Sequence, residues 1–236
     1  MNRGFRLIGL QVGLPRLHGR TDATEPMDRE WFSGFVKDAA SGPLRAGREG
    51  LEGDGQADRK NHGGPDKALC VYPMEHYEFW NAEIGPGFGP GAFGENFTVT
   101  GALEADVCLG DVFQIGEVVV EISQPRQPCW KLARRWRVKN LALQVERTGR
   151  TGWYLRVLQD GLIGAPADAA LLRRPHPEWS VALANEIMHH RKEDRTAAGE
   201  LAACPALSAS WRDSLGRRAR TGDIAPADTR RHGPDA

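Results

Sequence analysis

The sequence lacks a long apolar run and has no apolar segment near its start. No stretch of about 18 apolar residues occurs, which is the usual minimum for a transmembrane helix. Residues 1–15 contain two arginines but no continuous apolar segment of the kind that an export signal needs. We therefore expect a protein that does not enter a membrane and that stays in the cytoplasm.

Cysteine is also scarce, and its spacing excludes several kinds of metal site. The four cysteines form no CxxC pair, so a zinc knuckle is not expected. They are too scattered for an iron–sulfur cluster, and no flavin or haem signature accompanies them. In a reducing cytoplasm we expect free thiols rather than disulfides. The four residues are Cys70, Cys108, Cys129 and Cys204.

An excess of charge of either sign is absent as well. The 31 basic and 31 acidic side chains cancel to a formal net charge of zero. Such a chain has no overall field that would draw it onto nucleic acid or an anionic membrane, so neither is expected as a partner. With 236 residues, of which 40% are hydrophobic, it is long enough for one large domain or for a medium domain with a small appendage.

What the sequence does contain is a series of short segments typical of β-strands. Stretches rich in glycine and proline, such as residues 85–91, separate them. Many short strands between such turns favour a β-barrel over a sheet of alternating strands and helices. Helical spacing predicts a turn or two over residues 74–81 and one helix of imperfect period over residues 132–148. The expected strands cover residues 5–12, 68–72, 96–100, 107–115, 117–122 and 152–158.

The pattern changes after the breaker Pro175-His176-Pro177. Residues 180–188 and 207–218 carry apolar side chains at helical spacing, which predicts a small helical appendage. Its apolar faces are too small for independent stability, so we expect it to pack on the barrel or across a homodimer. The charged segment 189–195 is expected to be exposed, and the polar C-terminal end to be disordered.

Cys129 is the strongest candidate for a nucleophile or a metal ligand. It follows Pro128 in a loop after an expected strand, and nearby cations would favour its thiolate over its thiol. A thiolate can act as a nucleophile or as a soft metal ligand. The alternative is a buried structural cysteine, the role expected of the other three. The cations near it in sequence are Arg126, Lys131, Arg134 and Arg135.

A second candidate lies in the glycine-rich segment 53–68. His62 precedes Gly63-Gly64, and two glycines let backbone N–H groups approach an anion. Lys60 and Lys67 flank this group and could neutralise a phosphate, although the phosphate-loop pattern GxxxxGK[ST] is absent. The alternative is a surface hairpin that carries a solvated histidine.

Taken together, these segments resemble the MOSC domain, the family related to the C-terminal domain of molybdenum cofactor sulfurase. The match is closest to the branch of 6-N-hydroxylaminopurine resistance proteins. It covers residues 45–170, whereas the first 45 residues hold Pro/Gly/Arg stretches with no counterpart in the pattern. The matching pieces are Gly50–Asp58, His62–Leu69, Phe93–Asn96, Gly110-Asp111, Ser123–Cys129 and Gly149–Trp153.

The resemblance implies a mainly β (α+β) fold. It divides the chain into a MOSC-type β-barrel domain (1–175), a C-terminal three-helix domain (176–222) and a tail (223–236) that we expect to be disordered. It further implies that a polar cleft binds the molybdopterin form of the molybdenum cofactor, with the sulfur of Cys129 on the molybdenum as metal ligand and catalytic residue. The candidates for holding the pterin and its phosphate are Lys60, His62, Gly63, Gly64, Asp66, Asn96, Gln124, Arg126 and Lys131.

The branch also implies an activity. It is the reduction of an N–OH group in a small N-hydroxylated substrate, such as 6-N-hydroxylaminopurine to the amine, in a detoxification role. Because the chain shows no flavin, haem or iron–sulfur signature, a separate flavoprotein reductase is expected to deliver the electrons. A second hypothesis is a carrier that delivers the cofactor or sulfur through Cys129. A third is a binding module in which Cys129 is structural.

Overall fold

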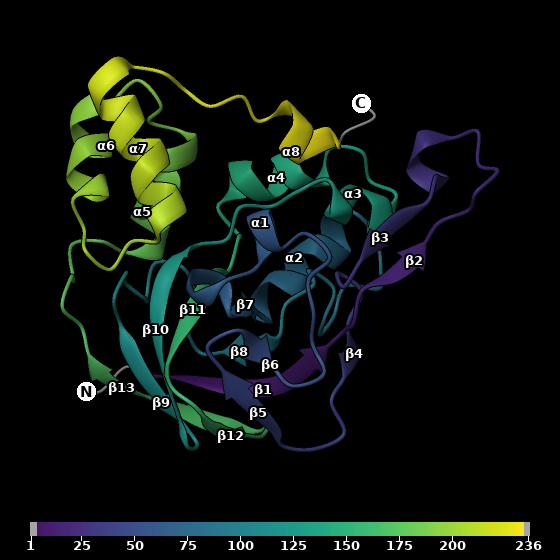
Figure 1. The fold of residues 1–236 in the computed structure, drawn as a ribbon, viewed down its shortest axis with the longest axis horizontal. Helices are drawn as coiled ribbons and strands as arrows, with labels where there is room; N and C mark the ends of the chain where they lie inside the picture. The colour runs from purple at the N-terminus through teal and green to yellow at the C-terminus, as the bar shows by residue number, and fades with distance from the viewer. Residues whose placement is uncertain (1–3, 234–236) are drawn as a thin grey trace.

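The computed structural model describes residues 4–233 and shows a β-barrel with helices packed around it (Figure 1). Seven strands pair in the order β13–β9–β10–β11–β7–β8–β1, and β1 pairs back with β13. The sheet therefore closes on itself, which removes the free edges of an open sheet. The strands are β1 (Phe5–Val12), β7 (Leu69–Pro73), β8 (Phe97–Thr100), β9 (Val112–Ile115), β10 (Val118–Pro125), β11 (Trp153–Gln159) and β13 (Ala167–Arg173).

Strand β13 completes the barrel, and the sequence did not predict it. It pairs antiparallel with β1, where Phe5 lies opposite Ala169, and with β9 on its other side. Of its seven residues only Ala169 is buried, so the strand lacks the several buried side chains that mark the other barrel strands. Closure of the barrel is thus made by backbone pairing more than by side-chain burial.

The barrel interior is filled by alternate side chains of the longer strands. Along β10, Val118, Val120 and Ile122 are fully buried, while the residues between them are partly exposed. Aromatic rings fill the centre, with the Phe5 and Phe113 ring centroids 4.8 Å apart. Such a close-packed interior makes the barrel a rigid base for the loops at its ends.

A second apolar cluster joins the helices beside the barrel. The rings of Tyr72 and Phe93 stack with centroids 4.1 Å apart, and the Trp80 Nε1–H donates to the Tyr72 hydroxyl at 2.6 Å. The cluster fixes the helix that begins just after Cys129. Its elements are the loop 85–95, α2 (Glu75–Glu83), α3 (Lys131–Trp136) and α4 (Leu141–Thr148).

Residues 132–148 do not form the single helix that we predicted. Arg137 adopts a left-handed φ of 55° and ends α3, and α4 begins at Leu141. A left-handed backbone is uncommon for a residue with a side chain, and here Arg137 ion-pairs with Asp28. The imperfect apolar period of this segment therefore marked a break between two helices. The break lets Leu141 and Val145 pack into the second cluster.

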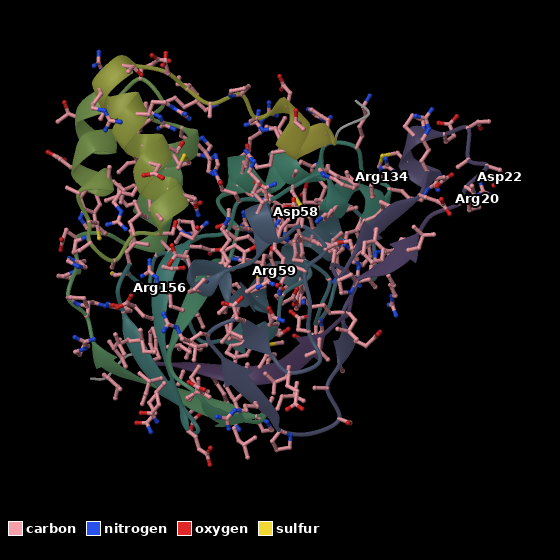
Figure 2. All side chains as sticks on the ribbon, viewed as in Figure 1. Arg20, Asp22, Asp58, Arg59, Arg134 and Arg156 are labelled. Carbon is pink, nitrogen blue, oxygen red and sulfur yellow. The ribbon has the colours of Figure 1, made fainter. Side chains whose placement is uncertain are left out.

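The stretch between β1 and β7 consists of short elements. The hairpin of β2 and β3 projects from the body (Figure 1). Arg134 of α3 lies beside this hairpin (Figure 2), and its Nη1 donates at 2.8 Å to the carbonyl of Arg29, in the connection between β2 and β3. The elements are β2 (Arg16–His18), η1 (Pro26–Asp28), β3 (Trp31–Ser33), β4 (Asp38–Ala39), β5 (Leu44–Gly47), β6 (Gly50–Leu51), α1 (Arg59–His62) and η2 (Pro65–Lys67), with β12 (Gly161–Ile163) paired to β5.

Three helices follow the barrel and share its core: α5 (Val181–His189), α6 (Arg195–Ala202) and α7 (Ala209–Thr221). Ser180, Asp194 and Ser208 cap them, each accepting a backbone N–H three residues along. The predicted fold class, a β-barrel with a small C-terminal helical appendage, is confirmed. None of the helices within residues 4–233 is long and apolar enough to cross a membrane.

The chain after α7 differs from the disorder that we expected. Residues 223–233 cross back over the molecule and form α8 (Asp228–His232), which lies beside α4 (Figure 1). Residues 234–236 lie outside the described part of the chain. The segment 189–195 is largely exposed, as expected, except at His189, whose side chain is only 5% exposed and whose ring lies 6.4 Å from that of Trp211.

Asp66 and Arg156 join the barrel to the helical appendage. Arg156 Nε donates to Asp66 Oδ1 at 2.6 Å, and its Nη1 donates to Glu121 Oε1 and to the carbonyl of Ala206, both at 2.7 Å. Asp66 also accepts the backbone N–H of Ala209 at 2.9 Å. Figure 2 shows Arg156 on the side of the barrel that faces the appendage. These bonds fix α7 relative to the segment that leads into β7.

Replacing a buried leucine of α7 should destabilise the whole protein. Leu215→Ala removes a fully buried side chain from the shared core, at a cost of about 2–5 kcal/mol. Calorimetry should show one transition, shifted to lower temperature. The control Leu162→Ala, at a side chain that is 50% exposed, should shift it little. Two separate transitions, only one of them moved, would contradict a shared core.

Candidate functional site

Cys129 lies in the loop that links β10 to α3. Strand β10 ends at Pro125 and α3 begins at Lys131. The carbonyl of Cys129 accepts the N–H of Leu132 at 3.1 Å, and the residue is 4% exposed. It lines two adjoining lobes of one cleft, which we call the inner and the outer lobe.

The inner lobe is a pocket whose walls carry many polar side chains, and it encloses about 570 Å³ with the open solvent at its mouth included. Its walls come from segments far apart in sequence: the loops 33–37, 54–57 and 94–96, the end of α1, and the loop that carries Cys129. The barrel brings these segments together, since several of them adjoin its strands. The charged and polar side chains on its walls include Lys37, Asp54, His62, Lys67, Asn96, Arg126, Lys131 and Tyr154.

The outer lobe is larger and encloses about 1320 Å³ with the open solvent at its mouth included. Besides Cys129, it shares His62, Lys67, Gln127 and Tyr154 with the inner lobe. Figure 2 places Asp58, the residue that caps α1, on the side of the molecule over which α8 passes. Cys129 therefore stands where a group bound in one lobe can meet a molecule in the other. The remaining walls are formed by Asp58, Lys60, Asn61, Gln124, Trp130, Ser210, Pro226, Thr229 and Arg230.

The surroundings of Cys129 favour its ionised form. Burial by itself raises the pKa of the thiol, because it disfavours the charged thiolate. The charge and the hydrogen bond of His62 outweigh burial, Lys131 and Arg126 add to the effect, and the pKa falls from 9.0 to about 6. Cys129 is consequently a thiolate at neutral pH, the form that acts as a nucleophile or a soft ligand.

The other three cysteines are also free thiols, but their pKa values are raised instead of lowered. Cys70 lines the inner lobe as well, but burial raises its pKa to about 11, with Arg126 opposing the rise and Glu95 adding to it. Burial is also the first cause that raises the pKa of Cys108 and Cys204. The contrast shows that proximity to His62, rather than burial, distinguishes Cys129.

Arg126 is a buried cation with an unused donor. It is 4% exposed, and its Nη2 donates to the carbonyl of Phe93 at 2.7 Å. Its Nη1 has no hydrogen-bond partner within residues 4–233. A buried charged donor left unpaired costs free energy. An anionic group bound in the inner lobe would satisfy it.

Asp54, an acidic group on the wall of the inner lobe, is already satisfied. Asp54 ion-pairs with Lys37 and accepts the Gly13 N–H at 2.8 Å and the Asn96 Nδ2 at 2.9 Å. The Oδ1 of Asn96 accepts the backbone N–H of Cys70 at 3.1 Å. Asn96, which the sequence put forward as a cofactor-binding residue, thus lines the lobe while its amide holds the surrounding loops together.

Most of the residues put forward from the sequence meet at this cleft. Gly63 and Gly64 do not line it: they form the turn after α1, where Gly64 adopts a φ of 89° that favours glycine. Asp66 does not line it either, because its carboxylate is held by Arg156 and the backbone of Ala209. Those that line one or both lobes are Lys60, His62, Asn96, Gln124, Arg126, Cys129 and Lys131.

Other cleft residues had escaped the sequence analysis. Lys37 lies in a loop with no motif around it, and Gln127 lies within the matching piece Ser123–Cys129 but was not put forward as a site residue. Tyr154 lies on β11, where strand alternation gave no sign of a special role; burial raises the pKa of its hydroxyl, with Arg126 opposing the rise, so the hydroxyl stays neutral. The C-terminal residues Pro226 and Arg230 were missed because disorder was expected there.

A metal held at this site would need ligands that the protein does not supply. Within residues 4–233, no group of three or more His, Cys, Asp or Glu side chains is placed to hold a metal ion. Cys129 offers one thiolate, so the other ligands would have to arrive with the metal. A metal carried on an organic cofactor meets this condition.

Comparisons with known proteins agree with this architecture. The MOSC domain model matches residues 58–167, and the YiiM-like 3-alpha helix domain model matches residues 179–222. The chain is 46% identical over 211 residues to the uncharacterized protein YflK of Bacillus subtilis, which covers 89% of this chain and 93% of YflK. The chain belongs to the MOSC family.

Within the MOSC family, the chain falls in the branch that the sequence predicted. The crystal structure of YiiM from Geobacillus stearothermophilus matches it with a TM-score of 0.76 and 36% identity, over 91% of this chain and 99% of that one. A longer protein of Gibberella moniliformis, named "Reductase", is 35% identical over 180 residues, which make up 75% of this chain but 32% of that protein. This MOSC protein is therefore YiiM-like in both its barrel and its helices.

Alkylation of the metal-free protein should report the lowered pKa of Cys129. Because the thiolate is the reactive form, the rate with iodoacetamide should rise as the pH increases through about 6. His62→Gln removes the strongest of the groups that lower this pKa, so the profile should move to higher pH. His176→Gln, away from the cleft, is the control. Peptide mapping assigns the site, and a native midpoint near 9 would disprove the thiolate.

Proposed function

We propose that the protein is a molybdenum-cofactor-dependent reductase of N-hydroxylated compounds such as 6-N-hydroxylaminopurine, with a role in detoxification. The observation that carries the proposal is the Cys129 thiolate at the junction of the two lobes. A cofactor held in the inner lobe would have its metal at this sulfur, within reach of a substrate in the outer lobe. The name of the Gibberella relative supports an oxidoreductase.

The donors on the walls of the inner lobe support binding of a pterin cofactor that carries a phosphate. The unpaired Nη1 of Arg126 and the ammonium group of Lys131, a residue only 6% exposed, offer donors to an anion. Cys129 offers the soft ligand that molybdenum needs from the protein. Lys60 and His62, both on α1, add positive charge on the side of the outer lobe.

Reduction of R–NH–OH to R–NH₂ and water consumes two electrons and two protons. When bound, the molybdenum cofactor would supply the two-electron chemistry. His62, which hydrogen-bonds the Cys129 sulfur and lines both lobes, is placed to hold a proton for the departing oxygen. The neutral hydroxyl of Tyr154 is a further polar group that can orient the substrate on the same wall.

Each turnover consumes electrons that have to be replaced, and we propose a separate flavoprotein reductase as their source. The Gibberella protein supports such a coupling, because a domain similar to this chain forms about a third of a longer chain named as a reductase. The small N-hydroxylated substrate and this electron donor are the two partners of the proposal.

Cys129→Ser should abolish turnover and molybdenum binding without unfolding the protein. A serine hydroxyl is a harder ligand and is not ionised near neutral pH. The measurements are molybdenum and pterin content of protein from a host that makes the cofactor, and turnover with an artificial electron donor. The control Cys108→Ala should keep its molybdenum content, its pterin content and its turnover. Full turnover by Cys129→Ser would refute the proposal, and native protein that binds molybdenum without turnover would favour a carrier.

Arg126→Ala should weaken cofactor retention more than it alters stability. Loss of one charge-assisted partner of a buried phosphate costs about 1.5–3 kcal/mol, or roughly ten- to a hundredfold in affinity. Lys60→Ala, at an exposed residue, should act in the same direction with a smaller effect. Pterin content after gel filtration is the measurement, and Arg45→Ala, 63% exposed, is the control. Native pterin content in both cleft variants would show that the phosphate is held elsewhere.

A further inference from the structure

The C-terminal segment, residues 223–233, passes back over the cleft after α7. It leaves the helical appendage and ends in α8, beside α3 and α4 (Figure 1). It lies outside both matched family models, which cover residues 58–167 and 179–222. We call this segment the strap. The strap is held in place by contacts with the loop that carries Cys129.

One residue of the strap, Arg230, holds the backbone on both sides of Cys129. Its carbonyl accepts the N–H of Trp130 at 2.8 Å, and its Nη1 donates to the carbonyl of Pro128. Gly233 is buried against the Trp130 ring, where an added Cβ would lie 3.4 Å from the indole. The loop that presents the thiolate is thus clamped from outside as well as held by the barrel.

The strap has a buried anchor on α4. Glu146 is 2% exposed; Arg230 Nη2 lies 2.6 Å from its Oε1, and Arg231 Nε donates to its Oε2 at 2.9 Å. Burial raises the pKa of Glu146, but the two arginines, joined by His189, outweigh it and leave this pKa below its usual value. An ion pair at this depth is little screened by salt, and removing one partner alone would leave a buried charge.

The strap also forms one wall of the outer lobe. Pro226, Thr229 and Arg230 line this lobe, together with Lys60 and Asn61 of α1. A molecule in the outer lobe near Cys129 therefore lies beside the strap. The width of the lobe depends on whether the strap stays anchored.

We propose that the strap roofs the compartment in which the substrate meets Cys129, and that Arg230 is a positioning residue for Cys129. The roof admits small free molecules and excludes a base still held in a nucleic acid strand or on another large carrier. Assigning this compartment to the substrate rests on the proposed function. The roof and the clamp rest on the contacts of Arg230, Arg231 and Glu146 alone.

The test compares two reagents on the full-length, metal-free protein: N-ethylmaleimide and a maleimide on a long polyethylene glycol chain. Peptide mapping gives the rate of each at Cys129, and their ratio cancels any change in the thiolate fraction. If the strap is open in only about 0.1–10% of molecules, the large reagent should react about tenfold or more slowly. Similar rates for the two reagents on the native protein would overturn the proposal.

A variant that releases the strap should remove this selectivity. Arg230→Ala/Arg231→Ala/Glu146→Gln takes away the two cations and their carboxylate together, so no buried charge is left unpaired. The ratio of the two rates should fall toward one. Asp228→Ala, an exposed position on the same helix, is the matched control and should keep the native ratio. An unchanged ratio in the triple variant would also overturn the proposal.

The other cysteines separate opening of the strap from unfolding. Cys70, Cys108 and Cys204 are buried and should stay unlabelled in the released variant. Labelling of all four cysteines at one rate would mean that the segment supports the whole fold, which contradicts a local roof. None of these measurements needs bound molybdenum, so failure of the proposed function would leave their outcome standing.

The clamp has a readout of its own. The N–H of Trp130 is bonded to the carbonyl of Arg230, so its hydrogen exchange should be slow in the native protein and in Asp228→Ala. It should speed up in the released variant, while amides of β10 and β11 stay protected. Equal protection of the Trp130 amide in all three proteins would disprove the clamp.

Discussion

A buried thiolate at Cys129 is the feature on which the rest of the site depends. An anion taken out of water has to be compensated by nearby cations and hydrogen-bond donors. Here they come from separate elements: His62 ends α1, Lys131 begins α3, and Arg126 follows β10. Their convergence needs a rigid base, because loop residues are placed only as accurately as the strands that carry them. The closed barrel supplies that base.

Two carboxylates at or beside the inner lobe, those of Asp54 and Glu95, already have partners of their own. Asp54 is held by Lys37 and by backbone and amide donors, and Glu95 accepts the N–H groups of residues 91 and 93 as well as the Tyr77 hydroxyl. These carboxylates tie loops together without engaging Arg126 or Lys131. The cleft therefore keeps positive charge for an anionic ligand, although the formal net charge of the chain is zero. An overall balance of charge does not fix the sign of a local field.

The strap makes the centre of the site depend on the end of the chain. Pro128 and Arg230 are 102 residues apart in sequence, and their bond sits beside the reactive sulfur. The barrel and the three helices account for the cleft itself, whereas the strap accounts for its roof. In a family with a common barrel, a segment of this kind can alter which molecules reach the reactive cysteine without changing the cysteine itself.

By itself, the sequence determined the fold class and pointed to Cys129. Short segments rich in apolar or β-branched side chains marked β1, β7, β8, β10 and β11, because most of these side chains are buried in the core. The sequence did not predict β13, which has one buried side chain and is held by backbone pairing. The sequence also did not predict that Arg230 lies at the cleft, because the polar composition of the strap is that of a disordered tail. Only the tertiary structure decided that Cys129 and not Cys70 is ionised, and that Asp66 joins β11 to α7 instead of lining the cleft. Periodicity and spacing report burial, whereas ionisation and ligand contact depend on which distant side chains approach, and for Cys129 that side chain is His62.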